Sequence, residues 1–153
     1  MVKEIVIAGG KRTPFGDFGK SLKDIPLSSL ATHAAKASVE DAGIKATDVD
    51  HLVWGNVLPV DPDGYYIGRV AALNIGMSES SCALQVNRAC GSGTQAIITA
   101  AQQILTGHGK IALAGGGENF SRGGFVNQKM RWGVTRGSQA FEDSVEWAYN
   151  DPF

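Results

Sequence analysis

Cys90 stands where an apolar run should meet an uncharged helix. The apolar residues 81–86 precede it and the Ala-rich residues 94–106 follow it. We expect a strand over 81–88 and a helix over 91–106. Unpaired N–H groups and the positive end of the dipole at a helix N-terminus favour a thiolate, which is the reactive form of cysteine. The spacing therefore predicts a cysteine nucleophile.

Cys90 could instead be a small buried hydrophobe, as most intracellular cysteines are. The sequence around it favours the nucleophile, because no Lys, Arg, Asp or Glu occurs between Ala89 and Gly109. We expect the helix to be buried on both faces, with its N-terminus in an interior crevice. Gly91 and Gly93 each weaken the first helical turn by about 1 kcal/mol relative to alanine, which close approach of a backbone or a substrate would explain.

The segment around Cys90 resembles the N-x-x-C-G-S-G-x-x-A segment of the thiolases, which carries their acyl-accepting cysteine at the start of a central helix. The residues that match are Asn87, Cys90, Gly91, Ser92, Gly93 and Ala96. Further segments agree in order and spacing: Arg12–Gly16, Arg69 with Ala71-Ala72, Ala114–Glu118 with Ser121-Arg122, and Met130–Gly133 leading to Asp151–Phe153. The resemblance implies the N-terminal half of a layered thiolase α/β fold, with a mixed, mostly parallel sheet and a buried central helix.

The resemblance also implies an activity. Cys90 would carry an acyl group between 3-oxoacyl-CoA or acetyl-CoA and coenzyme A, and its backbone N–H would stabilise the oxyanion. Coenzyme A and acyl-CoA would be substrates, with no tightly bound cofactor and no metal. A ketoacyl synthase also uses a cysteine, but the matches at Arg12-Thr13-Pro14 and Gly115–Glu118 favour a thiolase.

The chain departs from the thiolase pattern in two segments and in length. Where thiolases commonly have G-Q-N-x-A-R, Tyr65-Tyr66 replaces the Q-N, and where they commonly have S-R-A-P, Gly123-Gly124 replaces the A-P. These segments of thiolases shape subunit contacts and the rim of the pocket, so the departures bear on oligomer geometry and acyl-chain preference. A full thiolase is more than twice as long. Its activating histidine and second cysteine come from G-H-P and C-x-G-G segments of the C-terminal half, and neither motif occurs here.

The histidines of this chain do not supply the missing base. We expect His33 in a helix, His51 at the start of a strand, and His108 in the turn after the central helix, about 27 Å from Cys90 at about 1.5 Å per residue. Ordinary surface or cap roles suit all of these. The resemblance therefore implies that Cys90 is half of a catalytic pair, whose base would come from another chain or from a missing part of the gene.

A basic, aromatic segment follows Glu118. In thiolases the corresponding region opens the loop domain that helps to bind coenzyme A, so we expect substrate binding by Arg122, Arg131, Trp132 and Arg136. A solvated or partner-facing surface is the equal alternative. We then expect a short helix whose acidic side chains form a solvent-exposed face: Glu142, Asp143 and Glu146.

Composition indicates a soluble intracellular protein. With 153 residues, 43% hydrophobic content and a formal charge of −1, the chain can bury a core and has no general attraction for nucleic acid or membrane. Cys82 and Cys90 are the two cysteines, and we expect Cys82 to pack in its strand and no disulfide to form. The apolar run at residues 5–8 is too short for a signal peptide, which predicts the cytoplasm.

Alternating elements predict the α/β class. We expect strands over 4–8, 51–58, 81–88 and 110–114, and helices over 27–42, 65–73 and 91–106. A boundary is expected at Glu118, with a thiolase-like α/β domain over 1–118 and the start of a loop or lid region over 119–153.

Three interpretations of function remain. The first is the cysteine-bearing subunit of a two-chain thiolase, in a homo- or hetero-oligomer with a second subunit that carries the C-terminal half. The second is a thiolase-like scaffold without turnover. The third is a truncated fragment of a single-chain thiolase.

Overall fold

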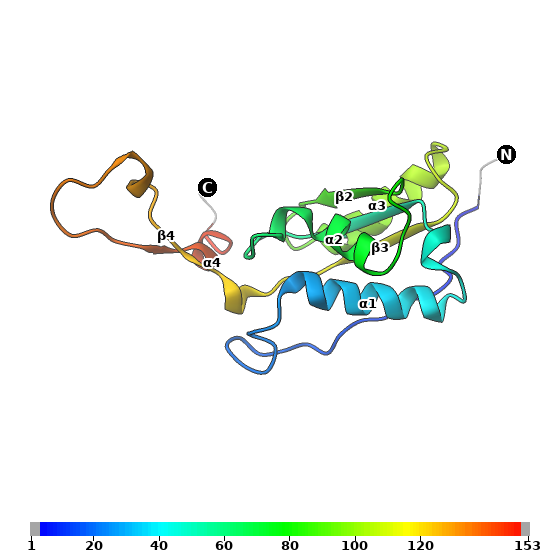
Figure 1. Cartoon of the computed structure of the whole chain (residues 1–153), viewed down its shortest axis with the longest axis horizontal. Helices are drawn as coiled ribbons and strands as arrows, with labels where there is room; N and C mark the ends of the chain where they lie inside the picture. The colour runs from blue at the N-terminus through cyan, green and yellow to red at the C-terminus, as the bar shows by residue number, and fades with distance from the viewer. Residues whose placement is uncertain (1–3, 151–153) are drawn as a thin grey trace.

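A three-stranded parallel sheet forms the centre of the computed structural model, which describes residues 4–150 (Figure 1). Strand β1 (His51–Gly55) lies between β2 (Cys82–Val86) and β3 (Ala112–Gly116). Its last residue, Gly55, pairs with Val86 on one side and with Gly116 on the other. The α/β class is confirmed. We expected a mixed, mostly parallel sheet, and this three-stranded sheet is parallel throughout, since both crossovers pass through helices.

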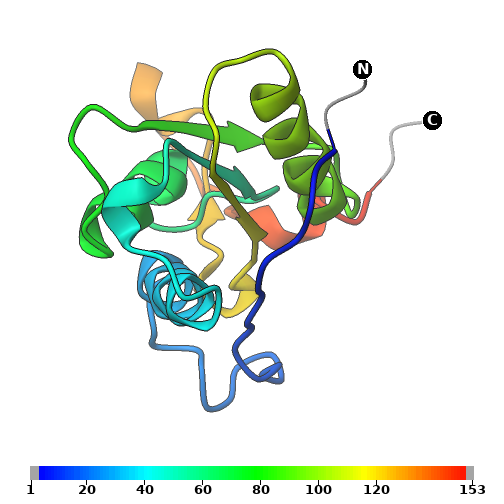
Figure 2. The same ribbon diagram turned by 90° about the vertical axis from the view of Figure 1, so that its right-hand side faces the viewer.

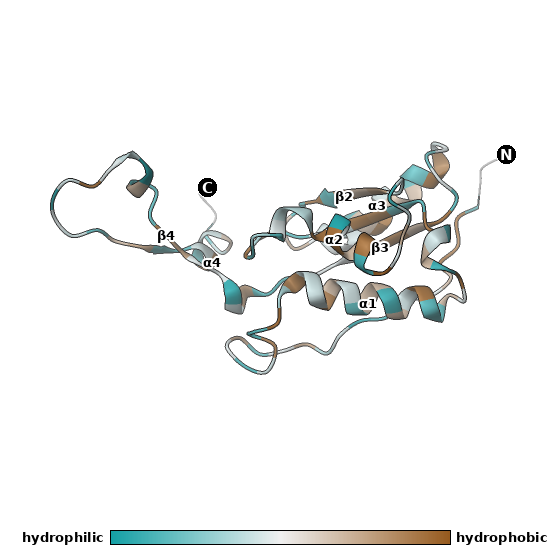
Figure 3. Ribbon diagram, in the orientation of Figure 1, coloured by the Kyte–Doolittle hydropathy of each residue, from teal (hydrophilic) through white to brown (hydrophobic). Residues whose placement is uncertain are grey.

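Helices cover both faces of the sheet. Helices α1 (Leu27–Asp41) and α2 (Ile67–Asn74) pack with Leu52 and Trp54 of β1. Helix α3 (Ser92–Leu105) packs on the other face, against Val53. Alternate residues of a strand point to opposite faces, so β1 contributes to both cores. Figure 2 shows α1 and α3 on opposite sides of the sheet, and Figure 3 shows that hydrophobic residues gather along the strands between them.

The strand expected at residues 4–8 does not form. This segment has no assigned strand, and Val6 and Ile7 are 75% and 84% exposed. It runs past α1 as extended chain, held farther on by a hydrogen bond from Lys11 N to Ser38 Oγ of 3.0 Å. An apolar β-branched run needs a neighbouring strand to pair with, and within residues 4–150 the edge strands leave it unpaired.

Other expected elements form with changed limits. The helix expected over 65–73 divides into a 3₁₀ turn, Gly64–Tyr66, and α2. The strand expected at 110–114 lies two residues later, because Asp50 binds the backbone N–H groups of Lys110 and Ile111. A further 3₁₀ turn, Ala46–Asp48, leads into β1.

The strand before Cys90 is not buried as we expected. Strand β2 is an edge strand, and Leu84 within it is 39% exposed. Cys82, expected to pack, is the first residue of β2 and is exposed. An edge strand has a neighbour on one side only, so its first residue lies at a rim of the sheet.

After β3 the chain leaves the sheet. It forms a 3₁₀ turn (Phe120–Arg122), the antiparallel pair β4 (Phe125–Val126) and β5 (Glu142–Asp143), and α4 (Ser144–Trp147). The loop between β4 and β5 contains another 3₁₀ turn, Met130–Trp132, and extends away from the sheet (Figure 1).

The acidic cluster expected on one short helix is divided between two elements. Glu142 and Asp143 lie in β5 and only Glu146 lies in α4. Asp143 caps α4 by accepting the N–H of Val145 at 2.9 Å, and Glu142 accepts Trp147 Nε1–H at 3.0 Å. Asp143 thus satisfies an otherwise unpaired N–H group at the start of α4, while Glu142 and Glu146 are exposed as expected.

Candidate active site

The carboxyl ends of the three parallel strands meet at one edge of the sheet. Residues 56–58 follow β1, residues 87–90 follow β2, and residues 117–119 follow β3. This edge therefore gathers Asn56, Asn87, Cys90 and Glu118. In open parallel sheets, ligands bind outside the carboxyl ends of the strands.

A hydrogen-bonded turn delivers Cys90 to this edge. Asn87 Oδ1 accepts the N–H of Ala89 at 3.0 Å. Ser92 Oγ accepts the N–H of Arg88 at 2.8 Å and donates to the carbonyl of Ala89 at 2.7 Å. Ala89 has a φ of 47°, the only positive value for a non-glycine residue within 4–150. Left-handed alanine costs about 1–2 kcal/mol, and such backbone strain persists where surrounding contacts over-determine it.

Cys90 lies just before α3, whose N-cap is Gly91. The expected position next to a helix N-terminus is therefore found. The expected crevice is not, because Cys90 is exposed. A cleft of about 440 Å³ lies elsewhere, between α1, β3 and residues 11–18, and Cys90 does not line it.

Helix α3 buries one face instead of two. Ser92, Ala96 and Ala100 are buried against the sheet. Ile97 is 51% exposed and Leu105 is 50% exposed on the rest of the helix. The absence of charges from α3 had suggested burial all round, but no other helix of residues 4–150 packs over this face.

The closest backbone approach is at Gly55, while a Cβ at Gly91 would lie 3.3 Å from the Arg88 carbonyl oxygen of its own turn. A Cβ at Gly55 would lie 2.6 Å from the carbonyl carbon of Ser92, and one at Gly116 would lie 3.2 Å from the Cα of Gly93. A Cβ at Gly93 would meet nothing within 4 Å. The first turn of α3 therefore rests directly on β1 and β3, and space remains open beside Gly93.

Glu118 binds the chain that leaves β1. Its Oε1 accepts the N–H of Val57 at 2.5 Å, and its Oε2 accepts Asn56 Nδ2–H at 2.9 Å and the N–H of Leu58 at 3.2 Å. Burial raises the pKa of Glu118 above its ordinary value, while these donors act in the opposite direction. Sequence reasoning assigned no role to this residue, because its partners lie about sixty positions away.

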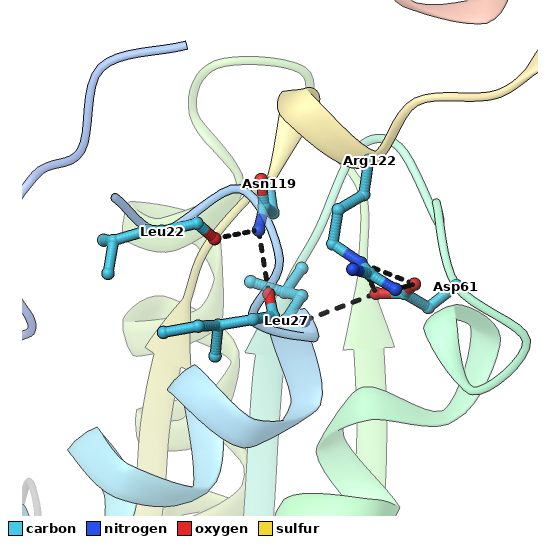
Figure 4. A network of polar contacts seen from close by, with 6 residues as sticks. Leu22, Leu27, Asp61, Asn119 and Arg122 are labelled. Atoms are coloured by element: carbon cyan, nitrogen blue, oxygen red, sulfur yellow. Dashed lines mark hydrogen bonds and ion pairs between the residues drawn. The ribbon is translucent and has the colours of Figure 1, made fainter. Parts of the chain in front are cut away.

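Arg122 pairs with a buried carboxylate. Its Nη2 lies 2.7 Å from Asp61 Oδ1, and its Nε donates to both Asp61 oxygens at 2.8 and 3.0 Å. Asp61 also accepts the N–H of Leu27 at 3.4 Å, and Asn119 donates to the carbonyls of Leu22 and Ile25 (Figure 4). The bond from Asp61 raises the pKa of Arg122 further above its high ordinary value. This network ties the start of α1 to the segment after β3.

The other residues expected to bind substrate lie away from Arg122. Arg131 and Trp132 belong to the 3₁₀ turn of the β4–β5 loop, and Arg136 follows in the same loop. All of them are exposed, Trp132 by 85%. The structure thus keeps these residues on one loop and commits Arg122 to Asp61.

The histidines lie at other places in the fold. His33 is exposed on α1, His51 begins β1 at the amino edge of the sheet, and His108 is exposed in the turn after α3. The amino edge is opposite to the edge that holds Cys90. His51 is therefore separated from Cys90 by the length of a strand and His108 by the length of α3, while His33 lies on α1, across the sheet from α3.

Similar proteins identify the family. The family model described as thiolase, N-terminal domain, matches residues 5–152. Beta-ketothiolase BktB of Cupriavidus necator is 42% identical over all of this chain, which spans 39% of that protein. The mitochondrial 3-ketoacyl-CoA thiolase of Homo sapiens is 34% identical over 95% of this chain and 37% of its own length.

Solved structures agree. The human mitochondrial 3-ketoacyl-CoA thiolase superposes with a TM-score of 0.89 at 34% identity, over 94% of this chain and 37% of the other. The Bacillus anthracis acetyl-CoA acetyltransferase gives a TM-score of 0.90 at 31% identity, over 96% of this chain and 37% of the other. The chain thus spans well under half of the relatives that it matches, and it belongs to the thiolase family, whose N-terminal domain it contains.

Proposed function

We propose that Cys90 is the acyl-accepting nucleophile of a thiolase that transfers acyl groups between 3-oxoacyl-CoA or acetyl-CoA and coenzyme A. The observation that carries this proposal is the turn at residues 87–91, which places an exposed thiol beside the N-terminus of α3 at the carboxyl edge of the sheet. Unpaired N–H groups at a helix N-terminus can donate to the negative charge that develops on a bound acyl group. Membership of the thiolase family supports the acyl substrate.

The reaction would proceed in two steps. The Cys90 thiolate attacks the ketone carbon of a 3-oxoacyl-CoA, and the carbonyl oxygen becomes an oxyanion to which the Cys90 N–H donates. The carbon–carbon bond next to that carbon then breaks, so that the acyl group remains on Cys90 and the departing carbanion takes a proton to become acetyl-CoA. The thiol of free coenzyme A loses its proton to a base and attacks the thioester, which releases acyl-CoA and the thiolate.

Protonation of the carbanion needs an acid, and deprotonation of the coenzyme A thiol needs a base. The histidines of residues 4–150 lie on other elements than Cys90, which supports our proposal that the base comes from beyond the described residues. We place it, with a second cysteine, on a second polypeptide that carries the remaining thiolase segments. The uncovered apolar residues of α3, Ile97 and Leu105, support such a docked partner.

The β4–β5 loop is our candidate for coenzyme A binding. Arg131 and Arg136 offer guanidinium groups for phosphates, and Trp132 offers an exposed ring for an adenine base. A structure of the human mitochondrial 3-ketoacyl-CoA thiolase was solved in complex with CoA. We exclude Arg122 from direct phosphate binding and propose that it positions the start of this segment, since Asp61 already neutralises its charge.

The test is thiolysis by the complex purified gently from its own cells. Coenzyme A-dependent cleavage of acetoacetyl-CoA should disappear in Cys90→Ala and persist in Cys82→Ala, because Cys82 lies at the opposite end of β2. Native mass spectrometry of the same sample should show a second polypeptide. Equal activity of wild type and Cys90→Ala would contradict the proposal and favour a scaffold without turnover.

A further inference from the structure

We propose that Asn87 and Glu118 act together as positioning residues for Cys90, through the peptide unit that joins Val57 and Leu58. This inference rests on the proposed role of Cys90 as nucleophile. It goes beyond that role, because it assigns a function to two side chains that touch neither the thiol nor, in our mechanism, the substrate.

The contacts form a continuous path. The carboxylate of Glu118 accepts the Leu58 N–H at 3.2 Å and the Val57 N–H at 2.5 Å. The Val57 carbonyl, which shares its peptide unit with the Leu58 N–H, accepts Asn87 Nδ2–H at 3.3 Å. Asn87 Oδ1 then accepts the Ala89 N–H at 3.0 Å.

Each contact reinforces the next. A peptide unit whose N–H donates to a carboxylate becomes a better acceptor at its carbonyl, because hydrogen bonds in series polarise one another. The Val57 carbonyl fixes the amide plane of Asn87 and therefore the direction of Oδ1. That oxygen holds Ala89, whose φ of 47° is unfavourable for alanine.

This path of hydrogen bonds holds Ala89 in its unfavourable backbone conformation. If Asn87 releases the Ala89 N–H, this residue can relax toward an ordinary φ, and Cys90 then turns away from the start of α3. Ser92 holds the same turn through its Oγ, so the turn would loosen rather than unfold. The thiol would then lose its place beside the N–H groups at the start of α3, where the proposed mechanism needs it.

Selective variants separate the links. Asn87→Asp keeps an oxygen for the Ala89 N–H but sets a second oxygen against the Val57 carbonyl. Glu118→Gln places an NH₂ group where the carboxylate faces only donors. Asn74→Asp is the matched control, since Asn74 is exposed on α2 and contacts only the Thr32 hydroxyl, at 3.4 Å.

The experiment measures alkylation of both cysteines by iodoacetamide in the full chain, resolved by peptide mass spectrometry. Loss of one hydrogen bond of ordinary strength corresponds to about tenfold, so Cys90 should react about tenfold more slowly in each variant. The Glu118→Gln/Asn87→Asp double variant should react no more slowly than the slower single variant. Cys82 is exposed at the other end of β2 and should react at the wild-type rate throughout.

Other outcomes are equally informative. Unchanged Cys90 rates, or effects that multiply in the double variant, would overturn the proposal. A parallel change at Cys82 would also overturn it, because that result indicates general loosening. If Glu118→Gln does not fold, the alkylation rate of Cys90 in Asn87→Asp alone decides whether the path positions Cys90. In the thiolysis assay these variants should lower kcat and leave KM for coenzyme A unchanged. If the variants are alkylated more slowly but the wild-type complex shows no thiolysis, only the proposed function is refuted.

Discussion

At the scale of single residues, a buried and a half-buried carboxylate hold together parts of the chain that are distant in sequence. Asp61, whose side chain is 7% exposed, joins Arg122 to the start of α1, and Glu118 joins β3 to the chain leaving β1. A buried charge is costly unless it is paired or hydrogen-bonded. These groups therefore stabilise the carboxyl edge only while their partners remain.

Removal of the Asp61 charge should destabilise this edge. Asp61→Asn leaves the Arg122 guanidinium partly buried without its partner and weakens the contact to Leu27 N. We expect a loss of about 2–4 kcal/mol in the free energy of unfolding, measured by urea denaturation. Asp24→Asn, at an exposed carboxylate, should change it by less than about 0.5 kcal/mol. Equal effects would show that the Asp61–Arg122 pair does not stabilise the fold.

Glu118 should make stability depend on pH. Its pKa is raised in the folded state, so between the unfolded and folded pKa values the native protein binds more protons than the unfolded chain. The free energy of unfolding should therefore fall as pH rises from the ordinary glutamate pKa through the raised one. Glu118→Gln cannot titrate and should lack this part of the slope. Identical slopes for wild type and variant in denaturation at several pH values would disprove the assignment.

At the scale of elements, the position of α3 depends on glycines of the strands beneath it. Gly55 and Gly116 let the first turn of the helix rest on β1 and β3. The local pattern around Cys90 predicted the strand, the turn and the helix correctly, since apolar runs and a glycine-rich junction specify them over short range. Ala89 and Gly55 were not predicted, because the contacts that require their conformation or size come from other elements.

The burial that we predicted from apolar sequence was also wrong, for a related reason. The uncharged α3 was predicted to be buried on both faces, and in residues 4–150 Ile97 on this helix is exposed. An apolar pattern indicates that a surface should be covered, but it does not say which segment covers it. Of the residues at the carboxyl edge, the sequence predicted a catalytic role for Cys90 alone. The role of Glu118 could not be predicted, because it depends on the fold that brings Glu118 to Val57.

Alanine at Gly55 should damage the fold, whereas alanine at Gly93 should not. A Cβ at Gly55 would lie 2.6 Å from the Ser92 backbone, which cannot move without shifting α3. We expect Gly55→Ala to lose about 2–3 kcal/mol of unfolding free energy. Gly93→Ala meets open space and should gain up to about 1 kcal/mol from helix propensity. Thermal melting of both variants provides the measurement, and similar losses would contradict the proposed helix position.

At the scale of the whole molecule, a layered core carries one uncovered helix face and one extended loop. Within residues 4–150 no helix is both long and apolar enough to cross a membrane. The apolar surfaces left exposed in these residues include those of α3 and of the aromatic residues in the β4–β5 loop. Both lie on elements that the proposed reaction uses, which links assembly to activity.

A charge on the uncovered face of α3 should prevent assembly without unfolding the chain. Ile97→Glu places a carboxylate on a half-exposed position, so the chain's own stability should change by less than about 0.5 kcal/mol. Binding of the second polypeptide should weaken at least about tenfold, because an unpaired charge would be buried in the interface. Co-purification and native mass spectrometry report this, with His33→Glu on the exposed face of α1 as the control. Undiminished assembly in Ile97→Glu would place the partner elsewhere.

The most direct test of the central claim is detection of the acyl-enzyme. The complex purified from its own cells is incubated with acetyl-CoA, quenched in acid and digested, and the peptides are analysed by mass spectrometry. Our account predicts one acetyl group on the peptide that contains Cys90, none on the peptide that contains Cys82, and loss of the label when coenzyme A is added before the quench. An unlabelled Cys90 in a complex that still turns over acetyl-CoA would contradict it.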